Sequence, residues 1–251
     1  MLSTDSPLVV YTQLSPHHSG LRTHAIDRIT PHCAVGQCTA EWLGEWFFRP
    51  TTRASSHYGV DRDGRIGQYV QEQNRSWCSS SEENDQRAVT IECASDTEEP
   101  YAFRPVVYER LIELCADVCR RNGKTKLLWL EDRDAALAYQ PKADEMVLTV
   151  HRWFANKDCP GAFIYEHLTE LANEVTYRLS DPTPKPVAPV VYNTVDELPD
   201  WAQPTIIKLI NAGALQGNGG APDEHGYPTG LSLSLDMVRT FVVLDRDGAI
   251  K

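Results

Sequence analysis

The sequence lacks a hydrophobic run long enough to cross a membrane. Among its 251 residues, no stretch approaches the roughly 18 uninterrupted apolar residues that a membrane-spanning helix requires. The first residues, MLSTDSPLVVYTQLSPHHSG, also lack the basic start and apolar segment of a secretory signal peptide. We therefore expect a protein that is made in the cytoplasm and has no membrane partner.

Basic residues are scarce. Lys and Arg together number 24 against 35 for Asp and Glu, which gives a formal net charge of −11. A chain of this charge repels the phosphate backbone, so nucleic acid is not an expected partner. The charge instead fits a small-molecule, polymeric or polycationic substrate.

A paired set of cysteines at disulfide or zinc-finger spacing is missing too. The chain has seven cysteines, an odd number, and no two of them form a C-x-x-C motif. Without an export signal, a disulfide framework is not expected. Cys115 and Cys119 lie one helical turn apart on an apolar face, so we interpret them as core residues.

One change in composition divides the chain. Residues 181–191 contain four prolines and no helical or strand periodicity, which is typical of an extended, semi-rigid linker. The linker separates a body, residues 1–180, from a tail, residues 192–251.

The body alternates strand-like and helix-like segments. These lie, in turn, at residues 25–33, 39–48, 89–94, 105–122, 146–151 and 162–179. The second segment is a helix expected to bury Trp42, Leu43, Trp46 and Phe47. Residues 57–60 and 65–70 flank the turn DRDG and predict a hairpin. The pattern predicts an α/β fold with a mixed central β-sheet flanked by helices, followed by a small helical C-terminal domain.

Two histidines and a cysteine stand where a metal can bind. His32 and His151 each end a strand-like run, and Cys159 follows His151 by eight residues in a loop. Imidazole nitrogen and thiolate sulfur are zinc ligands, and three protein ligands leave a fourth position for water, as in catalytic zinc sites. A structural role remains the alternative for His151 and Cys159 taken as a pair.

Five segments of the body carry a family resemblance: ITPHC, SSHYGVDRDGRIGQYV, RSW, VTIECAS and VHRWFANKDCPG. Together they resemble the zinc-dependent N-acetylmuramoyl-L-alanine amidases, a family shared by phage endolysins and peptidoglycan recognition proteins. The spacing H-x5-K-x-C-P-G is the most specific part. The resemblance implies one zinc ion per chain, the zinc ligands His32, His151 and Cys159, and the catalytic residues Tyr58, Glu92 and Lys157.

Each implied catalytic residue has a chemical role and a structural alternative. Glu92 is an isolated carboxylate in an apolar run, so burial can raise its pKa and make it a general base; otherwise it pairs with an arginine such as Arg87 or Arg62. Lys157 can direct its ammonium at a developing oxyanion, or it is a solvated loop residue. Tyr58 can donate a hydrogen bond to the same oxygen or bind the attacking water, or it is a strand tyrosine with its hydroxyl at the rim.

The segment RSW departs from the family pattern. Many relatives carry a histidine after this tryptophan, and here Cys78 stands in its place. Serines follow, so Trp77, Ser79 and Ser80 are the candidate substrate-binding residues. The departure affects the expected recognition of the stem peptide but not the expected hydrolysis.

The tail contains two amphipathic helix patterns, one starting at Trp201-Ala202 and closed by Gly213 and one from about Ser234, separated by a glycine-rich loop. This arrangement resembles a single, degenerate S-layer homology module. Two roles are open for the tail: attachment to a secondary wall polymer, or formation of a homodimer.

The sequence therefore predicts a peptidoglycan hydrolase that cleaves the amide bond between N-acetylmuramic acid and L-alanine. Without an export signal, it fits a phage or prophage endolysin that reaches the cell wall after holin-type release, with a bacterial autolysin as the other origin. The alternative function is a non-catalytic peptidoglycan-binding receptor of the same fold. Such receptors typically lack the cysteine ligand, and Cys159 is present.

Overall fold

The computed structural model describes residues 5–180, 191–199 and 201–250. The chain divides into two compact units, residues 1–184 and 185–251. Apart from Val191, the predicted linker at residues 181–191 lies outside the described residues. Within the described part, no helix combines the length and apolar character needed to span a bilayer.

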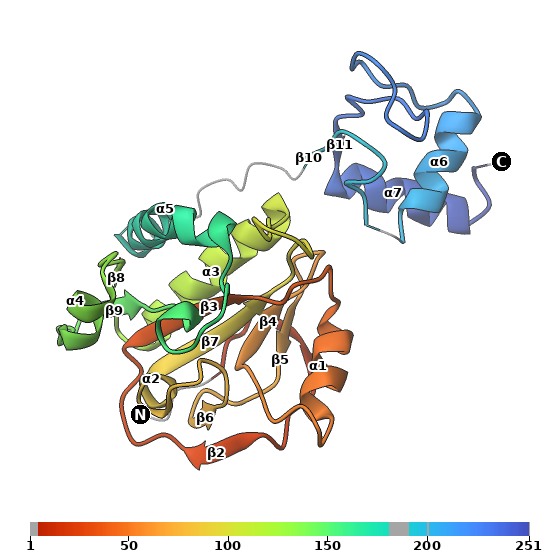
Figure 1. Cartoon of the computed structure of the whole chain (residues 1–251). Coiled ribbons are helices and arrows are strands. Elements are labelled where there is room, and N and C mark those ends of the chain that lie inside the picture. The colour runs from red at the N-terminus through yellow and green to blue at the C-terminus, as the bar shows by residue number, and fades with distance from the viewer. Residues whose placement is uncertain (1–4, 181–190, 200, 251) are drawn as a thin grey trace. The chain divides into compact units, whose positions relative to one another are not determined.

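The first unit is built on a seven-stranded mixed sheet (Figure 1). In spatial order its strands are β1 (Val9–Thr12), β5 (Ile66–Gln68), β4 (Tyr58–Val60), β7 (Ala88–Cys93), β3 (Arg28–Cys33), β9 (Glu145–Leu148) and β8 (Lys126–Leu128). Every neighbouring pair is parallel except β4 and β5, which form the predicted hairpin. The predicted mixed sheet flanked by helices is confirmed. A separate small sheet pairs β2 (His18–Leu21) with β6 (Asn74–Ser76).

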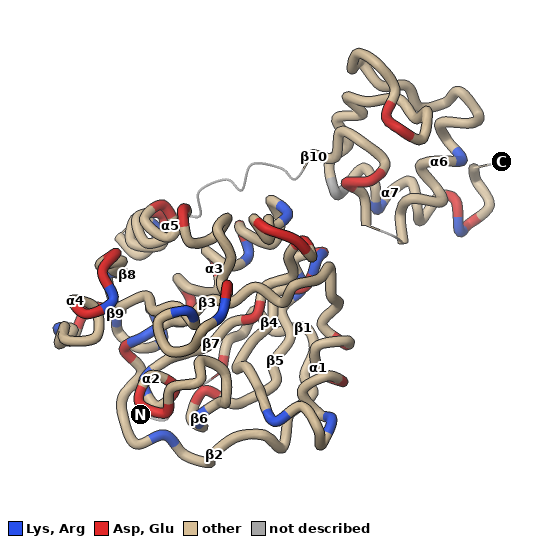
Figure 2. The backbone as a smooth tube through the Cα atoms, in the orientation of Figure 1, with Lys and Arg blue, Asp and Glu red and all other residues tan. Residues whose placement is uncertain are grey.

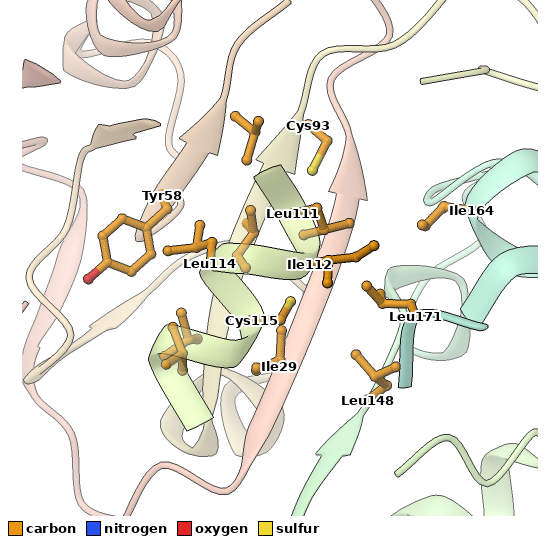
Figure 3. Packing of buried hydrophobic residues seen from close by; sticks show 14 of the residues in the cluster. Ile29, Tyr58, Cys93, Leu111, Ile112, Leu114, Cys115, Leu148, Ile164 and Leu171 are labelled. Atoms are coloured by element: carbon orange, nitrogen blue, oxygen red, sulfur yellow. The ribbon is translucent and has the colours of Figure 1, made fainter. Parts of the chain in front are cut away.

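Two long helices cover one face of this sheet. They are α3 (Pro105–Arg121) and α5 (Ala162–Ser180), and the core lies between them and the strands (Figure 3). Leu111 and Leu114 of α3 and Leu171 of α5 are fully buried there, beside Ile29 and Leu148 of the strands. The short helix α4 (Arg133–Ala138) lies between β8 and β9 in the chain.

Helices α1 (Ala40–Phe48) and α2 (Glu82–Arg87) lie on the opposite face. A Cβ atom on Gly59 of β4 would lie 2.7 Å from Leu43 Cδ1, so glycine is needed for α1 to approach the sheet.

Leu43 and Phe47 of α1 are buried as predicted, but Trp42 and Trp46 are 45% and 40% exposed and stack on each other. Only one stripe of a short surface helix can face the sheet, so the prediction that all four side chains are buried is wrong.

The second unit has a small core of its own. Strands β10 (Val191–Tyr192) and β11 (Leu233–Ser234) pair, and helices α6 (Gln203–Asn211) and α7 (Leu235–Arg246) pack together. Ile206, Val238 and Val242 are buried between them. The two predicted helices are confirmed, and the second begins just after Ser234, whose side chain accepts a hydrogen bond from the N–H of Met237. The S-layer resemblance stays a prediction.

Acidic and basic residues are spread over both units (Figure 2). Along the described backbone, Lys and Arg form no continuous stripe, and short acidic stretches interrupt them.

Candidate metal centre

Three parallel strands bring the predicted site residues to one edge of the sheet. His32 near the end of β3 is the register partner of Glu92 near the end of β7, so the two side chains point to the same face. Strand β9 runs parallel to β3 on its other side and leads to His151. The carboxyl ends of parallel strands meet at one edge, which is where sites form in such sheets.

His151 lies beyond its strand rather than in it. The sequence predicts a strand over residues 146–151, but β9 ends at Leu148 and His151 opens a 3-10 turn, η1 (His151–Trp153). The turn forms because the backbone N–H of Phe154 bonds to the carbonyl of His151, at 2.9 Å. The turn starts the loop that returns to Cys159.

The three predicted metal ligands are brought together. One ligand atom from each of His32, His151 and Cys159 lies within 4.8 Å of the other two. His32 Nδ1 is 3.3 Å from Cys159 Sγ, and the two imidazole ring centroids are 5.1 Å apart. Tetrahedral zinc, with bonds of about 2.0 Å to nitrogen and 2.3 Å to sulfur, separates such atoms by about 3.5 Å. The donor set and its spacing therefore fit zinc.

Burial keeps both histidines in the neutral form that binds metal. It lowers the pKa of His32 well below its usual value, and the nearby His151 lowers it further. Burial also lowers the pKa of His151, with a smaller contribution from the positive charge of Lys157. The pKa of the Cys159 thiol is raised, first by a hydrogen bond with Cys33 and then by burial. Metal binding at this thiol therefore releases a proton.

The loop between His151 and Cys159 is tied at both ends. The backbone N–H of Arg152 donates to the carbonyl of Cys159 at 3.1 Å, and its guanidinium donates to the carbonyl of Asp158. Trp153 is almost buried and stacks on Trp129, with ring centroids 5.0 Å apart. These contacts fix the position of Cys159 relative to η1.

Glu92 stands beside the metal ligands in a buried setting. Its Oε1 is 3.9 Å from His32 Nδ1 and 3.9 Å from Cys78 Sγ, and its Oε2 is buried without a hydrogen-bond partner in the described structure. Burial raises the pKa of Glu92 to about 8, and Cys78 lowers it slightly. Arg87, one of the predicted alternative partners, instead pairs with Asp27 at 2.5 Å. These features suit a carboxyl group that exchanges a proton near neutral pH.

The prediction that Tyr58 belongs to the site is wrong. Tyr58 pairs in register with Ile91, one residue before Glu92, so its side chain points to the opposite face, among the residues beside α3 (Figure 3). Its hydroxyl donates to Glu72 at 2.6 Å and accepts the backbone N–H of Ser6 at 2.9 Å. Glu72 is buried and bonds to Arg121 of α3, which makes this a structural network.

Lys157 is exposed in the loop before Cys159, and its charge reaches His151. This placement is compatible with the predicted role, and the role itself stays a prediction.

The three candidate substrate-binding residues differ in their surroundings. Ser80 lies at the site, with its hydroxyl 3.1 Å from His151 Nε2. Ser79 is fully buried and its N–H donates to Asp85, so the prediction that it contacts substrate is wrong. Trp77 is partly exposed, and its indole N–H donates to Ser19 at 2.7 Å. Its role stays a prediction.

Cys78 is a site residue that the sequence prediction missed. Its sulfur, His32 and Glu92 supply ligand atoms within 4.8 Å of one another, and burial raises the pKa of its thiol. The signal was present, because Cys78 stands where many relatives carry a histidine. The substitution predicts altered recognition of the stem peptide, and the structure in addition places a thiol beside the metal ligands.

The family model of N-acetylmuramoyl-L-alanine amidases, Amidase_2, matches residues 17–162, more than half of the chain. The chain belongs to this family. No curated protein matches it. Among solved structures, this amidase-family chain is similar to a selenomethionine derivative of AmpD, at 20% identity and a TM-score of 0.48, covering 68% of this chain and 99% of that one.

Two further structures are similar to this member of the amidase family. The endolysin amidase LysCS from Clostridium intestinale URNW has 17% identity and a TM-score of 0.46, covering 65% of this chain and 94% of that one. The hydrolase AmiA from Staphylococcus aureus, solved with its ligand, has 13% identity and a TM-score of 0.48, covering 71% and 94%.

Proposed function

We propose that the chain is a zinc-dependent peptidoglycan amidase of the endolysin type. It cleaves the amide bond between N-acetylmuramic acid and L-alanine. The observation that carries the proposal is the clustering of His32, His151 and Cys159 beside the buried carboxyl group of Glu92, in a chain of the amidase family. A non-catalytic receptor would need none of this proton-transfer chemistry.

In this proposal His32, His151 and Cys159 hold one zinc ion. When bound, zinc supplies Lewis acidity, both to a water molecule and to the substrate carbonyl. Glu92 accepts the proton of the attacking water, because burial makes its carboxylate more basic than an exposed one. The same carboxyl group then gives that proton to the departing amine. Lys157 stabilises the negative charge that develops on the carbonyl oxygen.

The metal ligands are tested by zinc content. We expect about one zinc per chain in the wild type, and a large loss in His151→Ala and Cys159→Ala, because each variant leaves two of the three protein ligands. Cys119→Ala is the matched control, since this thiol is buried in α3 on the opposite face of the sheet. Unchanged zinc content in both ligand variants would overturn the assignment.

The catalytic residues are tested separately from the metal. Glu92→Gln and Lys157→Ala should keep zinc and lose on the order of 10²–10⁴-fold in wall hydrolysis, the usual contribution of an acid–base group. Glu98→Gln and Lys126→Ala, both at exposed positions, are the controls. A variant with near-wild-type hydrolysis would remove that residue from the mechanism. Wall binding without any amine release by the zinc-loaded wild type would instead indicate the receptor function.

For the tail we propose attachment to a secondary wall polymer, with the homodimer as the competing outcome. The separate core of the second unit supports an independent binding module. The acidic character of residues 192–251 means that binding to an anionic polymer requires specific pockets rather than bulk charge. We also propose that the protein acts at the bacterial wall after holin-type release. Cell fractionation during lysis would test this, and a wild-type protein secreted before lysis would contradict it.

A further inference from the structure

The three strands that carry the site share a sequence feature. A threonine stands two residues before each key side chain: Thr30 before His32, Thr90 before Glu92, and Thr149 before His151. Residues two apart in a strand point to the same face, so Thr30 and Thr90 lie beneath His32 and Glu92. Thr149 follows the last residue of β9, and its hydroxyl lies 2.7 Å from that of Thr30. All three are completely buried.

Two of these threonines form a closed ring of hydrogen bonds with Asn84 of α2. Asn84 Nδ2 donates to Thr30 Oγ1 at 3.0 Å, and Thr149 Oγ1 donates to Asn84 Oδ1 at 3.0 Å. The third side joins the two hydroxyls at 2.7 Å. Thr149 uses its only hydrogen on the Asn84 oxygen, so Thr30 must be the donor on this third side. Each residue of the ring donates once and accepts within the ring.

The ring lies at the point where strand pairing between β3 and β9 stops. The register pairs of these strands are Arg28 with Val147 and Ile29 with Leu148, and the N–H of Thr149 then bonds to the carbonyl of Ile29 at 3.0 Å. Beyond this bond the chain turns into η1. In the part of the chain that the structure describes, the ring is therefore the last hydrogen-bonded link between the two segments before His32 and His151.

Thr90 is buried as well but has other partners. Its hydroxyl contacts Ser76 Oγ and the His57 Nδ1, each at 2.9 Å. Among the described residues, the Thr90 hydroxyl has no hydrogen bond to the ring. This difference supplies a matched control within the protein.

We infer that Thr30, Thr149 and Asn84 are positioning residues for the metal ligands. Their ring fixes the separation of the His32 and His151 side chains before a metal binds, whereas the Thr90 hydroxyl bonds to Ser76 and His57 instead. The inference rests on the proposed zinc site but concerns metal affinity rather than hydrolysis. The ring acts on His32 and His151 through the backbone segments that carry them, because His32 Nε2 is buried without a hydrogen-bond partner among the described residues and His151 Nε2 contacts Ser80.

The experiment measures zinc affinity by competition with a chelator in Thr30→Val, Thr149→Val and Thr90→Val. Each change keeps the shape of the side chain and removes one hydroxyl. We expect zinc affinity about 2–10-fold weaker in the first two variants, the equivalent of one lost hydrogen bond, and unchanged in Thr90→Val. Thr149→Ser keeps the hydroxyl and should restore wild-type affinity. The visible absorption spectrum of the cobalt-substituted protein, which reports ligand geometry, should change in Thr30→Val and Thr149→Val only.

Two results would overturn the inference. One is wild-type zinc affinity in both ring variants. The other is equal weakening in Thr90→Val, which would mean that any lost hydroxyl loosens the fold. If instead the wild type binds no zinc, the proposed metal site fails together with the inference. If the wild type binds zinc and cleaves walls while the ring variants bind equally well, the inference alone fails.

Discussion

At the scale of single residues, Glu92 and Tyr58 show what a motif can and cannot predict. Both were assigned to the site by resemblance, and they come from neighbouring strands. Glu92 is the register partner of His32, whereas Tyr58 pairs with Ile91 and points to the other face. A shift of one residue reverses the face of a side chain, and the register depends on how the strands pair in the folded sheet. The motif alone does not contain that information.

Tyr58→Phe should therefore affect stability and not catalysis. It removes the hydroxyl that bonds to buried Glu72 and to the N–H of Ser6. We expect the free energy of unfolding, measured with urea, to fall by about 1–3 kcal/mol, which is the typical cost of leaving buried polar groups unpaired. Hydrolysis of walls at a temperature where the variant is folded should match the wild type. A large loss of hydrolysis with unchanged stability would contradict this structural role and support a catalytic role for Tyr58.

His57 should make the metal-free protein sensitive to acid. Burial, assisted by the charge of Arg22, lowers its pKa to about 3 in the folded state, against about 6.5 when unfolded. Between these values only the unfolded chain binds a proton at His57, so stability is full above about pH 6.5 and falls as the pH drops. The His57 contribution amounts to about 1.4 kcal/mol per pH unit.

His57→Gln removes this proton uptake. Urea unfolding of metal-free protein at about pH 6 and about pH 5 should show a shallower loss of stability in the variant than in the wild type. Comparing slopes separates the titration from the hydrogen bonds that the substitution also removes. Equal slopes in the two proteins would contradict the assignment of a neutral, buried His57.

At the scale of elements, periodicity and capping predicted what depends on local sequence. The hairpin and the helices α1, α3 and α5 are where the sequence indicates, whereas the short helices α2 and α4 were not predicted. The 3-10 turn at His151 and the threonine ring were not predicted, because they depend on contacts between β3, β9 and α2. The repeated threonine two residues before each site residue was visible in the sequence, but its meaning requires the strand order.

The loop that carries Cys159 should not tolerate a side chain at Gly161. Its φ is +86°, and a Cβ atom there would lie 2.9 Å from the side chain of Tyr101. Gly161→Ala should cost at least about 1–2 kcal/mol of stability from the backbone conformation alone, and it should weaken zinc binding by displacing Cys159. Gly36→Ala, with open space around its Cβ, is the control. The measurements are thermal unfolding and zinc affinity; an unaffected Gly161→Ala would contradict the account of this loop.

At the scale of the whole molecule, composition alone predicted a division near the proline-rich segment. The boundary between the two compact units falls between residues 184 and 185 of the chain, inside that segment. The role of the tail could not be predicted from the sequence, because its two helices and small core are compatible with wall binding and with dimerisation.

A chain ending at Ser180 separates these two roles. If the tail binds the wall, this shorter protein should fold, bind zinc and cleave small soluble muropeptides, but lose activity on intact walls, because tethering raises the local concentration of the catalytic unit. Sedimentation of the isolated tail with purified walls is the direct check. A tail that stays in the supernatant while the full chain, unlike the shorter one, is a dimer by light scattering would favour assembly.

The central claim is that this chain cleaves one particular bond with a metal held by His32, His151 and Cys159. It is tested most directly by identifying the new chain ends that the zinc-loaded wild type releases from purified peptidoglycan. The account predicts new amino-terminal L-alanine, no new reducing sugar ends, and loss of this release in Cys159→Ala and in the presence of a chelator. New reducing ends, a different amino-terminal residue, or release that persists without metal would contradict it.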